Sequence, residues 1–176
     1  MKREIETKNI LFRRALLAGL LTAAGVALSV VSIPVGPTRC FPFQHAINVM
    51  AGVILGPFWA AGAAFTTSLI RNLLGTGSLF AFPGSIFGAL AVGTAAYFLG
   101  DRHKMYAALA EPFGTGVVGA WVSAAIAGPV TGTAASFAFF SFSFLVSSIP
   151  GALIGAAVLY ALEKRGLIGL FVKPKV

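Results

Sequence analysis

The sequence contains few charged residues. Only 10% of its 176 residues are Asp, Glu, Lys or Arg, whereas a soluble domain carries roughly 25%. Hydrophobic residues make up 57% of the chain, and the mean hydropathy is +0.90. Because so little polar surface is available to face water, this composition excludes a soluble globular protein. We expect one integral membrane domain over residues 1–176, with no room for an appended soluble module.

Acidic residues and cysteine are scarcer still. The five acidic residues all fall in segments that we predict to face the cytoplasm: Glu4, Glu6, Asp101, Glu111 and Glu163. We interpret Glu111, just before Pro112, as a first-turn acid near the inner surface. The single cysteine, Cys40, rules out an internal disulfide. With no paired carboxylates, Ser/His/Asp set, H-E-x-x-H or cysteine cluster, the sequence predicts neither an enzyme with catalytic residues nor a metal site.

Basic residues are concentrated in three clusters that flank apolar segments. Eleven of the 13 basic residues belong to them: Lys2, Arg3, Lys8, Arg13, Arg14, Arg102, Lys104, Lys164, Arg165, Lys173 and Lys175. Lys and Arg are enriched on the cytoplasmic side of membrane proteins, so both termini are predicted to be cytoplasmic. This orientation leaves only Arg39 and Arg71 toward the outside. Because no basic stripe alternates with exposed aromatic residues, nucleic acid is not a predicted partner.

Proline and glycine divide the apolar sequence into six predicted transmembrane helices. Their approximate ranges are 10–33, 44–55, 58–74, 83–99, 111–127 and 137–162. Pro34 to Phe43 is predicted to form a loop, and Gly128-Pro129 is predicted to end the fifth helix. The second helix would be only about 20 Å long, which is short for a hydrocarbon core of about 30 Å. The predicted fold is therefore an all-α, multi-pass bundle in the cytoplasmic membrane.

Polar side chains gather near the outer ends of the second to fourth predicted helices. Gln44, His45 and Asn48 begin the second helix, and Arg71 and Asn72 end the third. Polar groups at membrane depth are costly unless a neighbouring helix or a ligand satisfies them. They are therefore candidates either for helix capping and interhelical bonds or for binding a solute. With no acid predicted nearby, Arg71 would snorkel, bond backbone carbonyls or contact a ligand.

Aromatic and small residues suggest two further surfaces. Several aromatic rings could stack on a flat ligand or simply face lipid and core: Phe137, Phe139, Phe140, Phe142 and Phe144, with Trp121. Ala15, Gly19 and Ala23 recur every four residues and so share one face of the first helix. Such a face lets another helix approach closely, either from the same chain or from a partner subunit.

Several of these stretches together resemble the ThiW family, an S component of energy-coupling factor (ECF) transporters associated with the thiazole precursor of thiamine. The resemblance covers about residues 15–162 and is carried by residues 36–38, 41–45 with Asn48, 55–57, 68–78 and 81–85. Its specific part is residues 41–45 and 71–85, and the later helices match mainly in layout. It implies a six-helix substrate-binding subunit with an outward-facing pocket. It also implies a coupling membrane protein and two ATPase subunits as partners. Those partners would use ATP, whereas this chain would bind no cofactor. Ala15, Gly19 and Ala23 would contact the coupling protein.

The hypothesis that follows is capture of hydroxyethylthiazole from outside the cell. Its ring would lie against Phe41, Phe43, Phe80, Phe82 or Trp121. Its hydroxyl and ring nitrogen would bond His45, Asn48, Asn72 or Ser85. Because this ligand is neutral, Arg71 is predicted to organise a loop, and loops 34–43 and 75–82 to close over the ligand. The alternatives are an S component for thiamine or its pyrimidine precursor, a stand-alone facilitator or channel, and an intramembrane enzyme.

Overall fold

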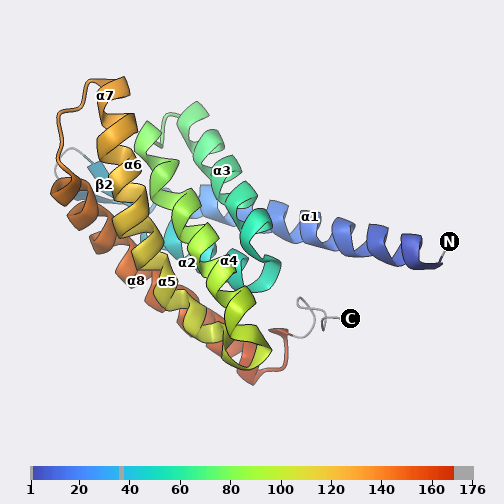
Figure 1. The fold of residues 1–176 in the computed structure, drawn as a ribbon. Helices are drawn as coiled ribbons and strands as arrows, with labels where there is room; N and C mark the ends of the chain where they lie inside the picture. The colour runs from blue at the N-terminus through green and yellow to red at the C-terminus, as the bar shows by residue number, and fades with distance from the viewer. Residues whose placement is uncertain (1, 36–37, 169–176) are drawn as a thin grey trace.

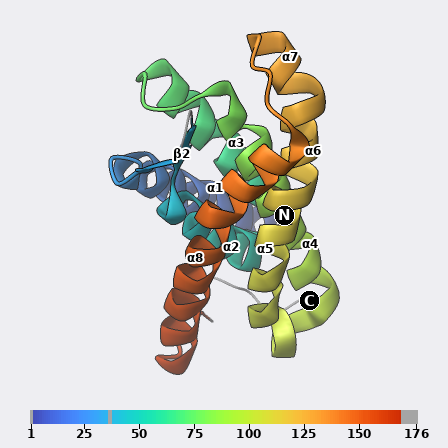
Figure 2. The ribbon, with the colours of Figure 1, turned by 90° about the vertical axis from the view of Figure 1, so that its left-hand side faces the viewer.

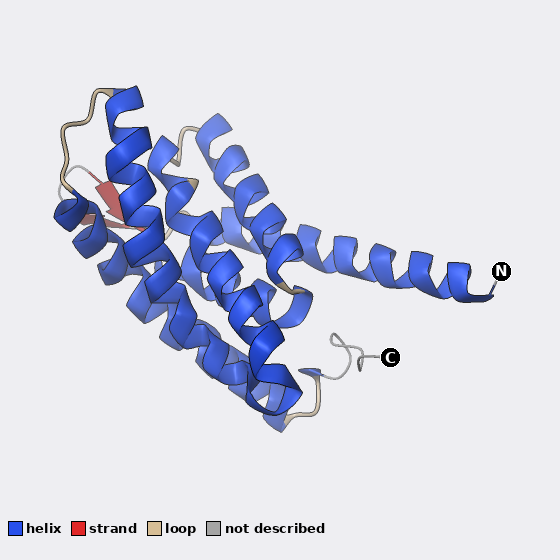
Figure 3. Cartoon of the chain, in the orientation of Figure 1, coloured by secondary structure: helices blue, strands red, loops and turns tan. Residues whose placement is uncertain are grey.

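The computed structural model describes residues 2–35 and 38–168, and this part of the chain is almost entirely helical (Figure 3). Residues 36 and 37 and the basic residues Lys173 and Lys175 lie outside the described residues. The α-helices and strands are α1 (Lys2–Leu28), β1 (Ile33–Val35), β2 (Thr38–Cys40), α2 (Pro42–Leu55), α3 (Pro57–Leu73), α4 (Pro83–His103), α5 (Ala110–Phe113), α6 (Ala120–Val122), α7 (Gly128–Thr131) and α8 (Phe137–Lys164). Short 3-10 segments are η1 (Leu79–Ala81) and η2 (Lys104–Leu109), and π-helical segments are η3 (Gly114–Gly119) and η4 (Ser123–Ala127).

The lengths and compositions of the helices are those of a membrane protein. Three helical stretches among the described residues are long and apolar enough to cross a membrane: Thr7–Leu28, Leu79–Thr131 and Phe137–Lys164. The second of these contains both α4 and the run from α5 to α7, and α2 is a shorter apolar helix. Large apolar side chains such as Phe12, Phe58 and Phe98 are exposed, as expected where lipid is the solvent. The predicted membrane class is therefore confirmed, whereas six crossings with cytoplasmic termini remain a prediction.

A two-stranded hairpin follows α1, where the sequence predicted helix to residue 33 and then a loop. Strands β1 and β2 pair in antiparallel register, with Ile33 opposite Cys40 and Pro34 opposite Arg39. The prediction was wrong here because three-residue strands carry no visible periodicity. Their stability comes from tertiary contacts: Cys40 Sγ donates to the carbonyl of Ser143 at 3.4 Å, and the Phe41 amide donates to Ser147 Oγ at 2.7 Å. The hairpin is thereby fastened to α8.

Helix α2 packs in the centre of the bundle, between α4 and α8. Small residues on α8 allow the close approach of that helix. A Cβ added to Gly155 of α8 would lie 2.8 Å from Val49 Cβ, and one added to Gly151 would lie 2.5 Å from His45 Cβ. The shortness of α2, predicted from its sequence, is confirmed. Its burial holds the polar residues of its first turns inside the protein.

The helical run from α5 to α7 is longer than predicted. It continues through the π-helical segments η3 and η4 and past Pro129, ending at Thr131 rather than at residue 127. Proline is tolerated in the first turn of a helix. The wider π-helical turns before α7 also interrupt the regular α-helical pattern of backbone hydrogen bonds before Pro129 is reached. Gly132, with φ of 69°, ends the run in the left-handed region.

Helix α1 is partly separate from the helical bundle. Figure 1 shows α1 extending away from the bundle toward its N-terminus, and Figure 2 shows α8 and the α5–α7 run side by side. Gly100, with φ of 68°, breaks α4 just before the predicted polar turn at 101–104. The chain then re-enters the bundle through η2, and this return positions the start of α5 beside α2 and α4.

Candidate functional site

A pocket lies where the β2–α2 junction, the end of α3, the start of α4 and α8 meet. Its lining residues are Arg39, Phe41, Gln44, His45, Arg71, Ser78, Phe80, Ala81, Gly84, Ser85, Ser143, Phe144 and Ser147. We call this the inner pocket. Its volume is about 440 Å³, a figure that includes the open mouth.

A second hollow adjoins the inner pocket, and we call it the vestibule. It is lined by Arg39, Phe41, Gly75, Thr76, Gly77, Ser78 and Phe80, with a volume of about 720 Å³ including open space. Four of these residues also line the inner pocket: Arg39, Phe41, Ser78 and Phe80. The two hollows therefore meet at a neck formed by two aromatic rings, an arginine and a serine. The loop after α3 forms the wall of the vestibule.

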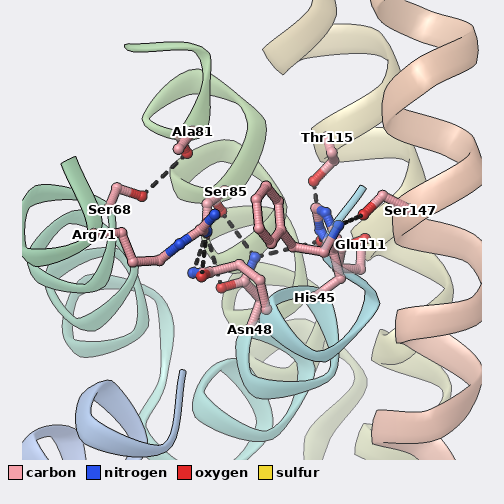
Figure 4. Close-up of polar contacts among 11 residues, drawn as sticks. His45, Asn48, Ser68, Arg71, Ala81, Ser85, Glu111, Thr115 and Ser147 are labelled. Carbon is pink, nitrogen blue, oxygen red and sulfur yellow. Dashed lines mark hydrogen bonds and ion pairs between the residues drawn. The ribbon is translucent and has the colours of Figure 1, made fainter. Parts of the chain in front are cut away.

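A continuous chain of hydrogen bonds runs beneath the inner pocket (Figure 4). Arg71 Nη1 donates to Gln44 Oε1 at 3.0 Å, and Gln44 Nε2 donates to Ser85 Oγ at 3.0 Å. Ser85 Oγ in turn donates to Asn48 Oδ1 at 3.1 Å, and Asn48 Nδ2 donates to Glu111 Oε1 at 3.4 Å. We call this the polar relay. It links a cation on α3 to an acid on α5 through α2 and α4, with every donor oriented toward the acid.

Glu111 is at the far end of the relay and is fully buried. Its Oε1 lies 2.5 Å from His45 Nδ1 and accepts from Thr115 Oγ1 at 3.0 Å. Gly88 on α4 leaves room for the carboxylate, because a Cβ there would lie 2.6 Å from Oε1. Glu111 is in the first turn of α5, as predicted, but the prediction that no acid lies near the polar cluster was wrong. The reason is that η2 returns the chain into the bundle before α5 begins.

Arg71 is at the opposite end of the polar relay from Glu111. It is only 1% exposed, so its side chain does not snorkel. Its guanidinium stacks over Phe41, with Cζ 3.7 Å from the ring centroid. Its backbone carbonyl accepts from the amides of Thr76 and Gly77 at 2.9 and 3.0 Å. Arg71 therefore joins the loop at 75–78, the β2–α2 junction and the relay in one place. Because the bonds to the loop come from the backbone carbonyl, the predicted role of the Arg71 side chain in organising a loop stays a prediction.

The family model for thiamine-precursor transporter protein (ThiW) matches residues 15–165. This chain belongs to the ThiW family. No curated protein and no solved structure matched the chain. The matched range contains the inner pocket, the vestibule and the polar relay. Membership in a transporter family implies a small-molecule ligand and a membrane setting, and it implies that this ThiW protein is not an enzyme.

The structure brings about half of the predicted binding residues of this ThiW protein together. Phe41, His45, Arg71, Phe80 and Ser85 line the inner pocket. Asn48, 1% exposed, lies one hydrogen bond behind the pocket, where it bonds the side chain and the backbone carbonyl of Ser85.

The remaining predicted residues lie elsewhere. Asn72 donates to the carbonyls of Ser68 and Ser78 at 2.8 and 3.0 Å, so it fastens the loop that follows α3. Phe82 packs on Phe65, with 5.4 Å between ring centroids. Phe43 is half-buried outside the lining of the pocket, and Trp121 is 60% exposed on the outer face of α6. Phe43, Phe82 and Trp121 are therefore not grouped with the pocket.

Several pocket residues of this ThiW protein were not predicted. Arg39, Ser78, Ser143 and Ser147 line the pocket, and Glu111 supports it, whereas Gln44 and Phe144, also in the lining, are candidates from the sequence. One signal was available: Ser143 and Ser147 are four residues apart and so lie on one face of α8. No comparable pattern identifies Glu111, because its neighbours in space come from distant parts of the sequence.

Proposed function

We propose that this chain is the substrate-binding S component of an ECF transporter and captures the thiamine precursor hydroxyethylthiazole. The observation that carries the proposal is the mixed lining of the inner pocket. Phe41, Phe80 and Phe144 supply flat apolar surface, and Gln44 and Ser85 supply uncharged hydrogen-bonding groups beside it. A small heteroaromatic alcohol needs this combination of stacking and hydrogen bonding.

The proposed orientation makes the pocket open to the outside. The pocket is at the start of α4, whereas Arg102 is in the last turn of α4 and Lys104 follows it. Lys164 and Arg165 are at the end of α8. If these basic residues face the cytoplasm, as the positive-inside rule favours, the pocket faces the external medium. Six crossings then leave both termini inside the cell and locate the protein in the cytoplasmic membrane.

Entry and closure follow from the two hollows. The ligand would pass the vestibule and separate Phe41 from Phe80 to reach the inner pocket, since these rings form the neck. Its hydroxyl and ring nitrogen would bond Ser85, Gln44 or His45. The hairpin β1–β2 and the loop at 75–78, which hold Arg39 and Ser78, would then close over it.

The face of α1 carrying Ala15, Gly19 and Ala23 supports docking of a coupling protein. All three residues are exposed, and no atom lies within 4 Å of a Cβ added to Gly19. Among the described residues, this stripe therefore does not serve packing within the chain. A partner helix could approach it closely. The proposed partners are the coupling membrane protein and two ATPase subunits, and those ATPases would supply the energy for uptake from ATP.

Transport assays in liposomes test this proposal. Liposomes containing this chain alone should bind hydroxyethylthiazole but not accumulate it, and adding the coupling protein, both ATPases and ATP should restore accumulation. Solute flux through the chain alone would instead support a channel, and a chemically changed ligand in mass spectrometry would support an enzyme. A preference for thiamine or its pyrimidine precursor in the same assay would change the assigned ligand but not the transport role.

A further inference from the structure

Arg71 is a buried cation whose hydrogen-bonding capacity is mostly unused. Its Nη1 donates to Gln44, but Nε and Nη2 have no hydrogen-bond partner among the described residues, although both atoms are shielded from solvent. A buried guanidinium without partners is costly, because its N–H groups lose water and gain nothing in return. The side chain lines the inner pocket, so a ligand that enters there and moves the covering side chains aside can supply the missing acceptors.

Within the part of the chain that the structure describes, no acid pairs directly with Arg71. None of the described residues lining the inner pocket is acidic, and a second cation, Arg39, lines the same pocket. Glu111 is connected to Arg71 only through the polar relay, and its Oε1 is already shared by His45, Asn48 and Thr115. The pocket wall is therefore positively charged.

The unused atoms have the geometry of an acid-binding fork. Nε and Nη2 are on one edge of the planar guanidinium, and that edge matches the two oxygens of a carboxylate or phosphate. The stacking of Arg71 over Phe41 holds this plane in place. Ser143 Oγ, also buried and without a partner among the described residues, lines the same pocket and can donate to the same acid.

We propose that the inner pocket prefers an acidic form of the heteroaromatic precursor, a carboxylate or a phosphate monoester, over the neutral alcohol. The acid is bound by Nε and Nη2 of Arg71 with Ser143 Oγ, and the ring lies toward Phe80 and Phe144. This inference rests on the proposed function, which assigns a heteroaromatic ligand, and it adds a negatively charged group to that ligand. A purely structural Arg71, which only stacks on Phe41 and bonds Gln44, would give no such preference.

Calorimetric titration of the purified full chain tests the proposal with four probes. These are hydroxyethylthiazole, its phosphate monoester, a thiazole carboxylate of similar size, and inorganic phosphate. We expect at least one thiazole acid to bind roughly tenfold or more tightly than the alcohol, as a bidentate charged hydrogen bond supplies. Comparing the affinities of the phosphate monoester and the carboxylate shows which acid the pocket prefers. Inorganic phosphate should bind weakly, because it lacks the ring.

Two variants test whether Arg71 causes the preference for the acid over the alcohol. Arg71→Lys keeps a positive charge but loses the planar fork, so the acid and the alcohol should bind with affinities that differ less than threefold, by the same reasoning. Arg102→Gln, an exposed arginine at the other end of α4, should retain the full preference. If Arg71→Lys does not fold, the wild-type series decides alone.

Three outcomes would overturn the inference. Equal or tighter binding of the alcohol by the wild-type chain would remove the acid subsite but leave the proposed function standing. An acid preference that survives Arg71→Lys unchanged would show that the fork is not its cause. Failure of every thiazole to bind would remove both the subsite and the proposed function.

Discussion

At the scale of single residues, the contact between His45 and Glu111 is the shortest side-chain hydrogen bond that we describe. The two atoms are 2.5 Å apart, and both side chains are buried. A buried charged group depends on its partners, so removing one partner leaves the other uncompensated. This pair closes the inner end of the polar relay and supports the pocket from below.

Glu111→Gln should therefore destabilise the folded protein by roughly 3 kcal/mol. The amide is close in shape and can still accept from Thr115, but the carboxyl group that contacts His45 is lost. Thermal denaturation of the purified protein in detergent measures the effect. The matched control, Glu163→Gln at the exposed end of α8, should change stability by less than about 0.5 kcal/mol. Equal melting temperatures for Glu111→Gln and the wild type would mean that the pair contributes nothing.

Asn48→Ala should weaken binding of hydroxyethylthiazole about tenfold while leaving partner assembly intact. Without its Oδ1, the hydroxyl of Ser85 loses its acceptor and is free to turn away from the pocket. Equilibrium dialysis with labelled ligand measures the change. Asn9→Ala, on the exposed start of α1, is the matched control and should bind as the wild type does. Unchanged affinity in Asn48→Ala would exclude the relay from ligand binding.

How far the sequence predicts these residues depends on their spacing. Gln44, His45 and Asn48 could be recognised as a polar group because they begin one helix, and Arg71 because a charge there is unusual. The role of Glu111 could not be predicted, because it depends on where η2 redirects the chain. The same limit applies to Trp121, whose exposure depends on the rotation of α6.

At the scale of elements, glycines set how closely the helices approach. Gly155→Leu should destabilise the bundle by about 3 kcal/mol or more, because its side chain would overlap Val49 of α2. Gly19→Leu is the matched variant on an open face, and it should leave stability and ligand binding unchanged but prevent assembly with the coupling protein. Thermal denaturation and co-purification separate the two effects. Assembly retained in Gly19→Leu would remove α1 as the docking surface.

The hairpin offers a second test through Cys40. Burial raises the pKa of this thiol above its ordinary value, so less thiolate is present near neutral pH than in a free cysteine. We expect slow maleimide labelling of the folded protein at pH 7, a faster rate as the pH rises toward the pKa, and rapid labelling after unfolding in detergent. Because Cys40 is the single cysteine, the signal is unambiguous. Folded and unfolded chains labelled at the same rate would show that the hairpin is not fastened to α8.

Helix positions were more predictable than helix ends. Apolar runs and proline or glycine breakers located α2, α3, α4 and α8 well, since length and hydropathy carry that information. The end of α7 was misjudged because Pro129 was read as a breaker, whereas it is in a first turn that tolerates proline. The hairpin was missed because its pairing is stabilised by α8, which no local pattern reveals.

At the scale of the whole molecule, the proposed ligand-binding site and the proposed docking surface occupy different regions. The inner pocket and vestibule are formed by the β2–α2 junction, α3, η1, α4 and α8. The small-residue face belongs to α1, whose N-terminal part stands away from the bundle (Figure 1). A capture subunit needs this separation, because its partner must bind without blocking entry of the ligand. Variants should accordingly divide into those that lose binding and those that lose assembly.

The central claim is that the inner pocket holds the ligand, and a substitution that fills the pocket tests it most directly. Ala81→Trp adds a large ring to the pocket lining, whereas Ala125→Trp adds the same ring to an exposed site on η4. In equilibrium dialysis with labelled hydroxyethylthiazole, the wild type and Ala125→Trp should each bind one ligand per chain, and Ala81→Trp should bind none. Wild-type affinity in a folded Ala81→Trp protein would contradict the account.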